Sequence, residues 1–203
     1  GKDNAPDITS NQSASVAVKT DKGVDYAQFV VVTSAPEALT GSNYVYNLSS
    51  TYVGYSKDNN GDDAYYYEVI KDGEKVVIAT DKNRLNANTI YNYGVDEEAF
   101  GGDSANDVLA GLYDLTAMPA SGFKAGVAVD VVNSGVIVGN SNAIQFVLAP
   151  ETMIVDLDTA DSTTDIVFDA TVDDDDTITV VYDVVGGLNM AKAIYITDTG
   201  ANG

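Results

Sequence analysis

The hydrophobic positions of this chain recur mostly at every second residue, in short runs separated by turn residues. Residues 126–132 place Val127, Val129 and Val131 on one side of an extended segment, and residues 177–184 alternate in the same way. Alternation of this kind is typical of strands with one face in a core. No apolar repeat with a helical period persists for three turns. The pattern therefore predicts an all-β protein of short antiparallel strands with at most single-turn helices.

Two predicted hairpins are joined by sequences that favour tight turns. Asp72-Gly73 separates a strand at residues 64–70 from a strand at residues 75–80, and Asn133-Ser134-Gly135 follows the strand at 126–132. Asp-Gly suits a two-residue turn because that turn requires positive φ angles. A one-residue slip would move each apolar set to the opposite face, so the alternation also sets the pairing register.

The spacing of these strands predicts two small sequential units, each a β-barrel or β-sandwich. We assign residues 1–24 to a linker or edge strand, residues 25–122 to a Tyr-rich β unit and residues 123–203 to an Asp-rich β unit. Residues 26–33 resemble residues 190–197, and both segments read as a strand that closes a unit. This repeat predicts that the chain is a processed or excised part of a tandem array.

Composition narrows the chemistry. The 203 residues carry a formal net charge of −21 and include no histidine, cysteine or tryptophan. Zinc fingers, haem ligation, iron–sulfur clusters and Ser-His-Asp triads all need residues that are absent. Some pair of carboxylates is always available among 31 acidic residues, so such a pair does not indicate a glycosidase. We therefore expect no enzyme activity and no cofactor other than a hard cation with oxygen ligands, such as Ca²⁺.

The charge also bears on partners. Ten basic residues among 203 do not supply the clustered positive charge that phosphate binding needs, so nucleic acid is not an expected partner. An anionic bilayer would repel the chain, and no apolar stretch approaches the length of a membrane span, so we expect no direct membrane insertion.

One candidate calcium site lies between two Tyr-bearing strands. Asp58, Asn60 and Asp62 have the alternate spacing with which a calcium loop begins. The pattern then departs from such a loop, because Asp63 stands where glycine is expected and Val69 where a bidentate glutamate is expected. The alternative is a polar β-turn.

A second candidate metal site is the acidic stretch of the second half. Adjacent carboxylates repel one another, and a cation would relieve that repulsion. The alternative is a solvated loop that keeps the protein soluble. The residues concerned are Asp156, Asp158, Asp161, Asp173, Asp174, Asp175 and Asp176.

Tyrosines are concentrated before the acidic stretch, with ten of the thirteen between residues 44 and 113. Exposed tyrosines mark sugar and protein contacts, which makes Tyr65, Tyr66 and Tyr67 a candidate ligand surface. Strand alternation must place at least one of these rings on the opposite face from its neighbours. The alternative is packing between strands.

Several strand and turn phrases carry a resemblance. They are Ala110-Gly111-Leu112-Tyr113-Asp114-Leu115-Thr116, the segment 131–138, the segment 176–181 and a closing segment 191–197, set around the Asp-rich middle. This succession resembles the repeated β-rich ectodomain regions of S-layer-homology (SLH) cell-surface proteins of Firmicutes.

The resemblance implies a structural, non-catalytic ectodomain segment of an S-layer-like protein, located outside the cell at the bacterial surface or wall. Its partners would be neighbouring domains of the same polypeptide and neighbouring copies in a surface layer, with calcium stiffening the acidic loops. No SLH anchor module is visible in these residues, so anchoring would belong to another part of the parent protein.

Two alternatives stay open. One is an adhesin, or a carbohydrate- or protein-binding module, that uses the Tyr-rich first half. The other is a pilus or phage-tail subunit, which would form ordered polymers.

Overall fold

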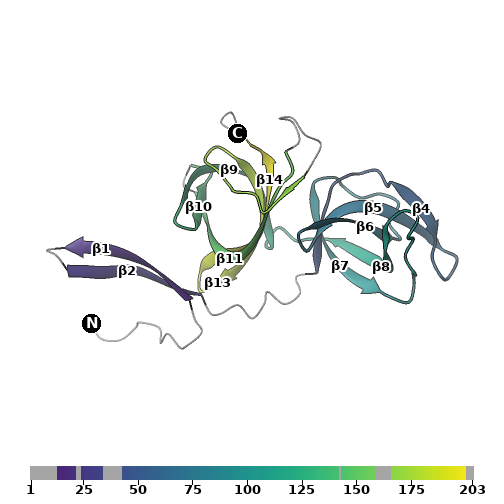
Figure 1. Cartoon of the computed structure of the whole chain (residues 1–203), viewed down its shortest axis with the longest axis horizontal. Helices are drawn as coiled ribbons and strands as arrows, with labels where there is room; N and C mark the ends of the chain where they lie inside the picture. Colours follow the sequence, from purple (N-terminus) through teal and green to yellow (C-terminus); the bar gives the residue numbers. More distant parts are fainter. Residues whose placement is uncertain (1–12, 22–23, 34–42, 142, 159–165, 200–203) are drawn as a thin grey trace. The chain divides into compact units, whose positions relative to one another are not determined.

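A computed structural model describes residues 13–21, 24–33, 43–141, 143–158 and 166–199. The chain divides into two compact units, residues 1–41 and residues 42–203 (Figure 1). Every regular element among the described residues is a β-strand, which confirms the all-β prediction.

The first unit contains one antiparallel hairpin. It consists of β1 (Ser13–Asp21) and β2 (Val24–Thr33), with a register shift between Ala17 and Val18. The strand β2, which we had assigned to the start of the Tyr-rich unit, pairs with β1.

The first barrel lies in the second unit. Its ring order is β3, β5, β6, β8, β7 and back to β3, and β6 and β8 run parallel. The edge strand β4 pairs with β5 outside this ring. The strands are β3 (Tyr44–Asn47), β4 (Gly54–Lys57), β5 (Asp63–Lys71), β6 (Glu74–Thr80), β7 (Thr89–Asp96) and β8 (Val108–Ala117).

The second barrel follows along the chain. Its ring order is β9, β10, β11, β14, β13 and back to β9, and β11 and β14 run parallel. The short strand β12 pairs with β11 outside this ring. The strands are β9 (Phe123–Asn133), β10 (Val136–Gly139), β11 (Ile144–Asp156), β12 (Val167–Phe168), β13 (Thr177–Val185) and β14 (Leu188–Asp198).

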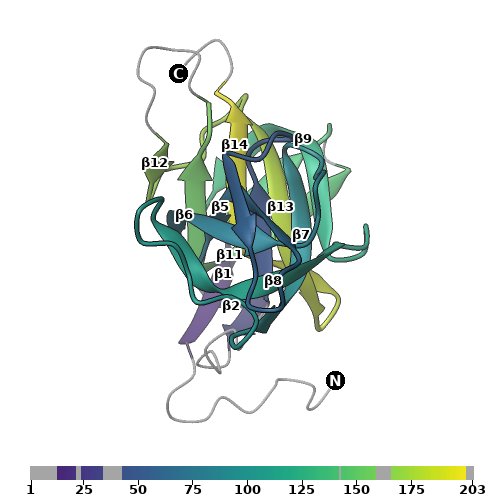
Figure 2. The same ribbon diagram turned by 90° about the vertical axis from the view of Figure 1, so that its right-hand side faces the viewer.

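Both barrels therefore have the same connectivity. Counted within each ring, the order is first, second, third, fifth, fourth, and the third and fifth strands are parallel. The pairings β3–β5 and β10–β11 close each ring, so each unit is a five-stranded Greek-key barrel whose ring has no free edge. Figures 1 and 2 show the curved sheets of the two barrels. The prediction of two small sequential units, each a β-barrel or a β-sandwich, is confirmed, and both units are barrels.

The predicted hairpin turns are present. Asp72 and Gly73 have φ angles of 51° and 80°, and Ser134 and Gly135 have φ angles of 50° and 79°. Positive φ at both central residues matches the right-handed twist of the flanking strands.

Each barrel has an apolar interior, and a further apolar cluster joins the two. In that cluster Tyr46 and Ile70 of the first barrel pack with Val181 and Tyr195 of the second. The ring centroids of Tyr46 and Tyr195 are 4.4 Å apart. We call this cluster the shared core; it consists of Tyr46, Ile70, Ile90, Val155, Val181, Ala193 and Tyr195.

The shared core changes how β13 is buried. The predicted apolar face holds Ile178 and Val180 in the interior of the second barrel, yet Val184 on that face is 63% exposed. Val181, on the opposite face, is buried in the shared core, and Thr179 is also buried. The strand is thus covered on both faces in its first half, because the first barrel supplies the second cover.

Candidate functional site

The predicted calcium loop forms the turn between β4 and β5. The Asp58 Oδ1 atom accepts the backbone N–H groups of Asn60 and Asp62 at 2.9 and 2.8 Å. The Asn59 side chain donates to the Glu98 carbonyl oxygen at 2.6 Å. One carboxylate oxygen of Asp58, the first residue of the predicted calcium loop, therefore stabilises the turn itself, as expected of an aspartate in a tight turn.

Aspartates of the acidic stretch also accept hydrogen bonds from the backbone. The Asp174 Oδ1 atom accepts the Val132 N–H at 2.8 Å, and the Asp156 Oδ1 atom accepts the Asp158 N–H at 2.8 Å. The Asp158 Oδ2 atom accepts both the N–H and the hydroxyl of Thr199 at 3.0 Å. Asp161 lies outside the described residues.

Asp176 is the buried aspartate among the described residues of this stretch. Its side chain is 3% exposed, and its Oδ2 atom accepts the Asp173 N–H at 2.8 Å. Burial raises the pKa of the Asp176 carboxyl, and the negative charges of Asp173, Asp156 and Asp175 add to the increase. The fold thus brings acids from the end of β11 and from the turn before β13 into one electrostatic neighbourhood.

This neighbourhood is not an assembled metal centre. Across the described part of the chain, no three His, Cys, Asp or Glu side chains are grouped so that they hold an ion. A calcium ion at either acidic segment therefore stays a prediction.

The three consecutive tyrosines of β5 point to different sides. Tyr67 is fully buried inside the first barrel, whereas Tyr66 packs against Phe100 on the other face of the sheet, with its hydroxyl 3.2 Å from Asp103 Oδ2. Tyr65 is half-buried. Neither Tyr66 nor Tyr67 presents a ring to solvent, so a ligand surface on this strand is limited to Tyr65.

The aromatic surface of the first barrel comes from other tyrosines. Tyr55 on β4 is 66% exposed, and Tyr52 just before β4 is 39% exposed. The Tyr52 ring centroid lies 5.2 Å from that of Tyr65 and 6.4 Å from that of Tyr55. We call Tyr52, Tyr55 and Tyr65 the tyrosine ridge. The sequence alone did not distinguish Tyr52 and Tyr55 from the buried tyrosines, because only the pairing of the strands places β4 at an edge.

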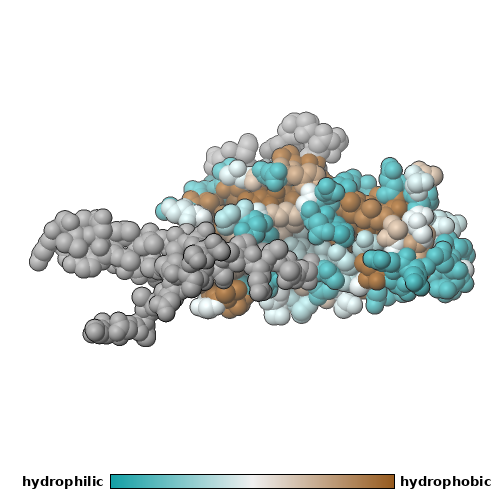
Figure 3. Space-filling view, turned by 60° about the horizontal axis from the view of Figure 1, so that its bottom comes forward, coloured by the Kyte–Doolittle hydropathy of each residue, from teal (hydrophilic) through white to brown (hydrophobic). Residues whose placement is uncertain are grey.

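Apolar surface elsewhere is found on the second barrel. Val167, Phe168, Val184 and Val185 are all more than a third exposed. In the face shown in Figure 3, brown apolar surface lies over the second barrel, and smaller brown areas lie among polar surface on the first. Such scattered apolar residues are usual on protein surfaces.

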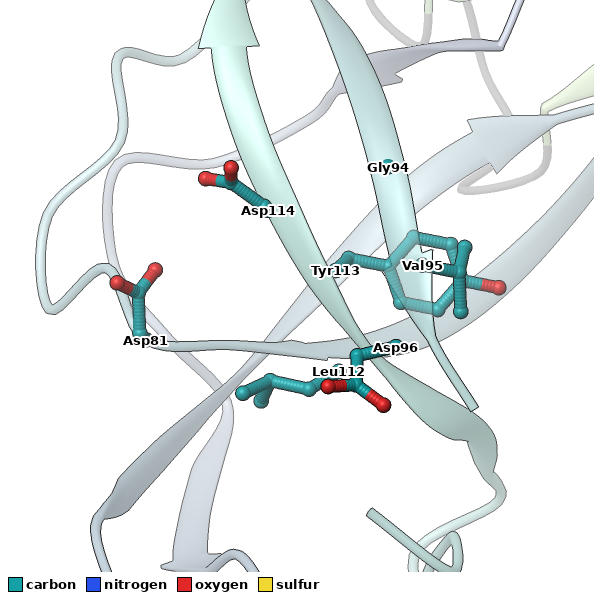
Figure 4. A pocket seen from close by; sticks show the side chains of 7 residues that line it. All are labelled: Asp81, Gly94, Val95, Asp96, Leu112, Tyr113 and Asp114. Carbon is teal, nitrogen blue, oxygen red and sulfur yellow. The ribbon is translucent and has the colours of Figure 1, made fainter. Parts of the chain in front are cut away.

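An open depression of about 340 Å³ lies on the first barrel (Figure 4). Its charged groups are Asp81, Asp96 and Asp114, and the Tyr113 ring lies beside Val95. Lys82 Nζ is 2.9 Å from an Asp81 carboxylate oxygen and 3.5 Å from an Asp114 carboxylate oxygen, so it offsets one of the three negative charges. The remaining lining residues are Gly94, Val95 and Leu112. An anionic substrate would be repelled here.

Comparison with known proteins adds no assignment: no family model, no curated protein and no solved structure matches the chain. Among the described residues there is no helix with the length and apolar character needed to cross a membrane.

Proposed function

We propose that this chain is a structural, non-catalytic ectodomain segment of a bacterial S-layer-like surface protein. The observation that carries the proposal is the shared core, in which aromatic and aliphatic side chains of two consecutive barrels are buried against each other. Consecutive domains joined by such a core transmit force without a flexible joint, which is what a surface layer requires of its building blocks.

Closed barrels and acidic surfaces support the same role. A closed ring leaves only the short strands β4 and β12 as sheet edges, and short edges limit aggregation at high local concentration. The net charge of −21 keeps neighbouring copies solvated, and cations outside the cell would offset it. The partners would be neighbouring domains of the same polypeptide and neighbouring copies in the layer.

Labelling of intact cells tests the location. Antibodies raised against the 203-residue chain should label the source bacterium by immunogold without permeabilisation. Labelling that appears only after permeabilisation would exclude a surface role.

Calcium stiffening belongs to the proposal as well. The mutual repulsion around Asp176 is the feature that a divalent cation would relieve. A protein that binds calcium only when folded should melt at a higher temperature in millimolar Ca²⁺ than in EDTA. At a calcium concentration a hundredfold above Kd, binding adds about 2.7 kcal/mol to the free energy of unfolding. An equal, small response to Ca²⁺ and Mg²⁺ would mean charge screening alone and would remove calcium from the proposal.

The tyrosine ridge favours a second candidate function, a carbohydrate- or protein-binding module. On a glycan array, binding that is lost in Tyr55→Ser but kept in Val184→Ser would support it, because both variants remove an exposed apolar side chain and only one alters the ridge. Equal binding by the two variants would count against the ridge.

A further inference from the structure

The hairpin β1–β2 has an equivalent in the second barrel. In β1–β2, Val16 pairs with Val30 and Ala17 with Phe29, and the register then shifts before Val18. In β13–β14, Val180 pairs with Ile194 and Val181 with Ala193, and the register then shifts before Tyr182. From Ala14 in β1 and Ile178 in β13 onward, both hairpins therefore have the same pairing and share this irregularity. The hairpin β13–β14 has a second register shift, between Thr177 and Ile178, that β1–β2 lacks.

The two sequences align over this whole length without a gap. Residue 13 corresponds to residue 177 and residue 33 to residue 197. The apolar positions agree along both strands except at the end of the first, where Thr20 and Asp21 correspond to Val184 and Val185. A β-bulge occurs at a specific position in a strand pair. A bulge at the same aligned position in both hairpins is therefore stronger evidence that the hairpins are equivalent than the shared apolar pattern alone. The identical pairs are Val16 and Val180, Gly23 and Gly187, Ala27 and Ala191, and Thr33 and Thr197.

The first barrel does not provide such a match. Its fourth and fifth strands, β7 and β8, are joined by the long segment 97–107 rather than by a tight turn. The hairpin β1–β2 therefore corresponds to the hairpin β13–β14 of the second barrel and not to the β7–β8 pair of the first.

In the second barrel this hairpin is not self-sufficient. β13 pairs antiparallel with β9, and β14 pairs parallel with β11. Val180 and Ile194 are buried against Ile137 of β10 and Phe146 of β11. A two-stranded hairpin alone is at best marginally stable in water. Among the described residues, β1 and β2 pair only with each other. No described strands take the place beside them that β9, β10 and β11 take beside β13 and β14.

We propose that β1–β2 is the fourth and fifth strand of a further barrel, and that its partner is a three-stranded sheet equivalent to β9–β11 from a preceding segment of the same polypeptide. The second barrel itself gives the order, since β9, β10 and β11 come before the hairpin in its chain. The β9–β11 strands of a second copy are a poorer partner because their edges are already paired with β13 and β14. The functional meaning of this inference, a continuous array of barrels, rests on the proposed structural role.

A fusion protein tests the pairing. Residues 119–176 are placed directly before residues 13–203, so that Asp176 is joined to Ser13 as it is naturally joined to Thr177. Hydrogen–deuterium exchange of peptides from residues 13–33 should slow at least tenfold relative to the 203-residue chain, because strand amides become protected when the barrel closes. The matched control carries Ile137→Asp and Phe146→Asp in the added copy alone, and its hairpin should exchange as fast as in the 203-residue chain.

Each other outcome would overturn the proposal. Fast exchange of residues 13–33 in the fusion, with β13–β14 still protected, would show that the added strands do not pair with the hairpin. Protection of the hairpin in the monomeric 203-residue chain would place its partner within this chain. Protection that appears only with dimers at high concentration would identify a second copy as the partner. None of these results depends on where the protein is located, so they are distinguishable from a failure of the immunogold test.

Discussion

Gly139 lies at the end of β10, where the strand runs unusually close to β9. A Cβ atom at this position would lie 2.6 Å from Val127 Cγ1 and 2.7 Å from the Ala128 carbonyl oxygen. The backbone contact cannot be relieved by a rotamer change, so Gly139→Ala should lower the free energy of unfolding by about 1–3 kcal/mol in urea titrations. Gly94→Ala is the matched control, because nothing lies within 4 Å of its added Cβ atom. Equal effects of the two substitutions would contradict the close approach.

Asp176 should make stability depend on pH in the direction opposite to that of most paired carboxylates. Its pKa is raised in the folded protein. Its contribution is therefore fully present below the ordinary pKa of aspartate and is lost as pH rises through the raised value. Asp176→Asn removes that loss while keeping an oxygen that accepts the Asp173 N–H, so the variant should gain stability relative to the wild type between pH 4 and pH 7.

Urea titrations at both pH values measure this difference. Asp174→Asn is the control, because Asp174 is exposed and also accepts a backbone N–H. A variant that loses stability relative to wild type at pH 7 would show that the charge of Asp176 is favourable.

At the scale of elements, Thr152 holds together the irregular part of β11. Its hydroxyl accepts the Ala149 N–H at 2.8 Å and donates to the Ala191 carbonyl oxygen of β14 at 2.9 Å. This bridge spans the register shift between Leu148 and Met153 in the parallel pair. Thr152→Val keeps the side-chain shape but removes both bonds, and should cost about 1–3 kcal/mol by thermal or urea melting. Thr116→Val, at an exposed position of β8, should stay within about 0.5 kcal/mol of wild type.

The elements predicted from the sequence are those whose signals are local. The Asp72-Gly73 turn and the alternation on both sides of it identify a hairpin without reference to the rest of the chain. The ring closures were not predictable in this way, because the parallel pairs β6–β8 and β11–β14 join strands that other strands or long segments separate in sequence. Pro150 within β11 also interrupts the pattern of one long strand, and the register shift accommodates it.

The candidate sites were less predictable than the strands. Alternation correctly placed Tyr66 on the other face from Tyr65 and Tyr67, yet it does not tell which face a second barrel or a loop covers. Likewise, four adjacent aspartates look alike in the sequence, and only the fold makes Asp176 the buried one.

At the scale of the whole molecule, the shared core should make the two barrels unfold together at high pH. Burial raises the pKa of Tyr46 to about 12 and that of Tyr195 well above its ordinary value. Tyrosines of an unfolded chain ionise near pH 10. The neutral, buried tyrosines therefore contribute their full stability below about pH 10, and this contribution is lost as pH rises through the folded values.

We accordingly expect cooperative unfolding of both barrels between about pH 10 and pH 12, followed by far-ultraviolet circular dichroism and by tyrosinate absorbance in the same samples. Tyr46→Phe should move the midpoint to higher pH, because it removes one group whose ionisation favours the unfolded chain. Tyr55→Phe should leave the midpoint unchanged, since the Tyr55 ring is mostly in water. If all tyrosines ionised near pH 10 while the circular dichroism stayed native, the rings of Tyr46 and Tyr195 would have to be open to solvent, and the two barrels would not share a core.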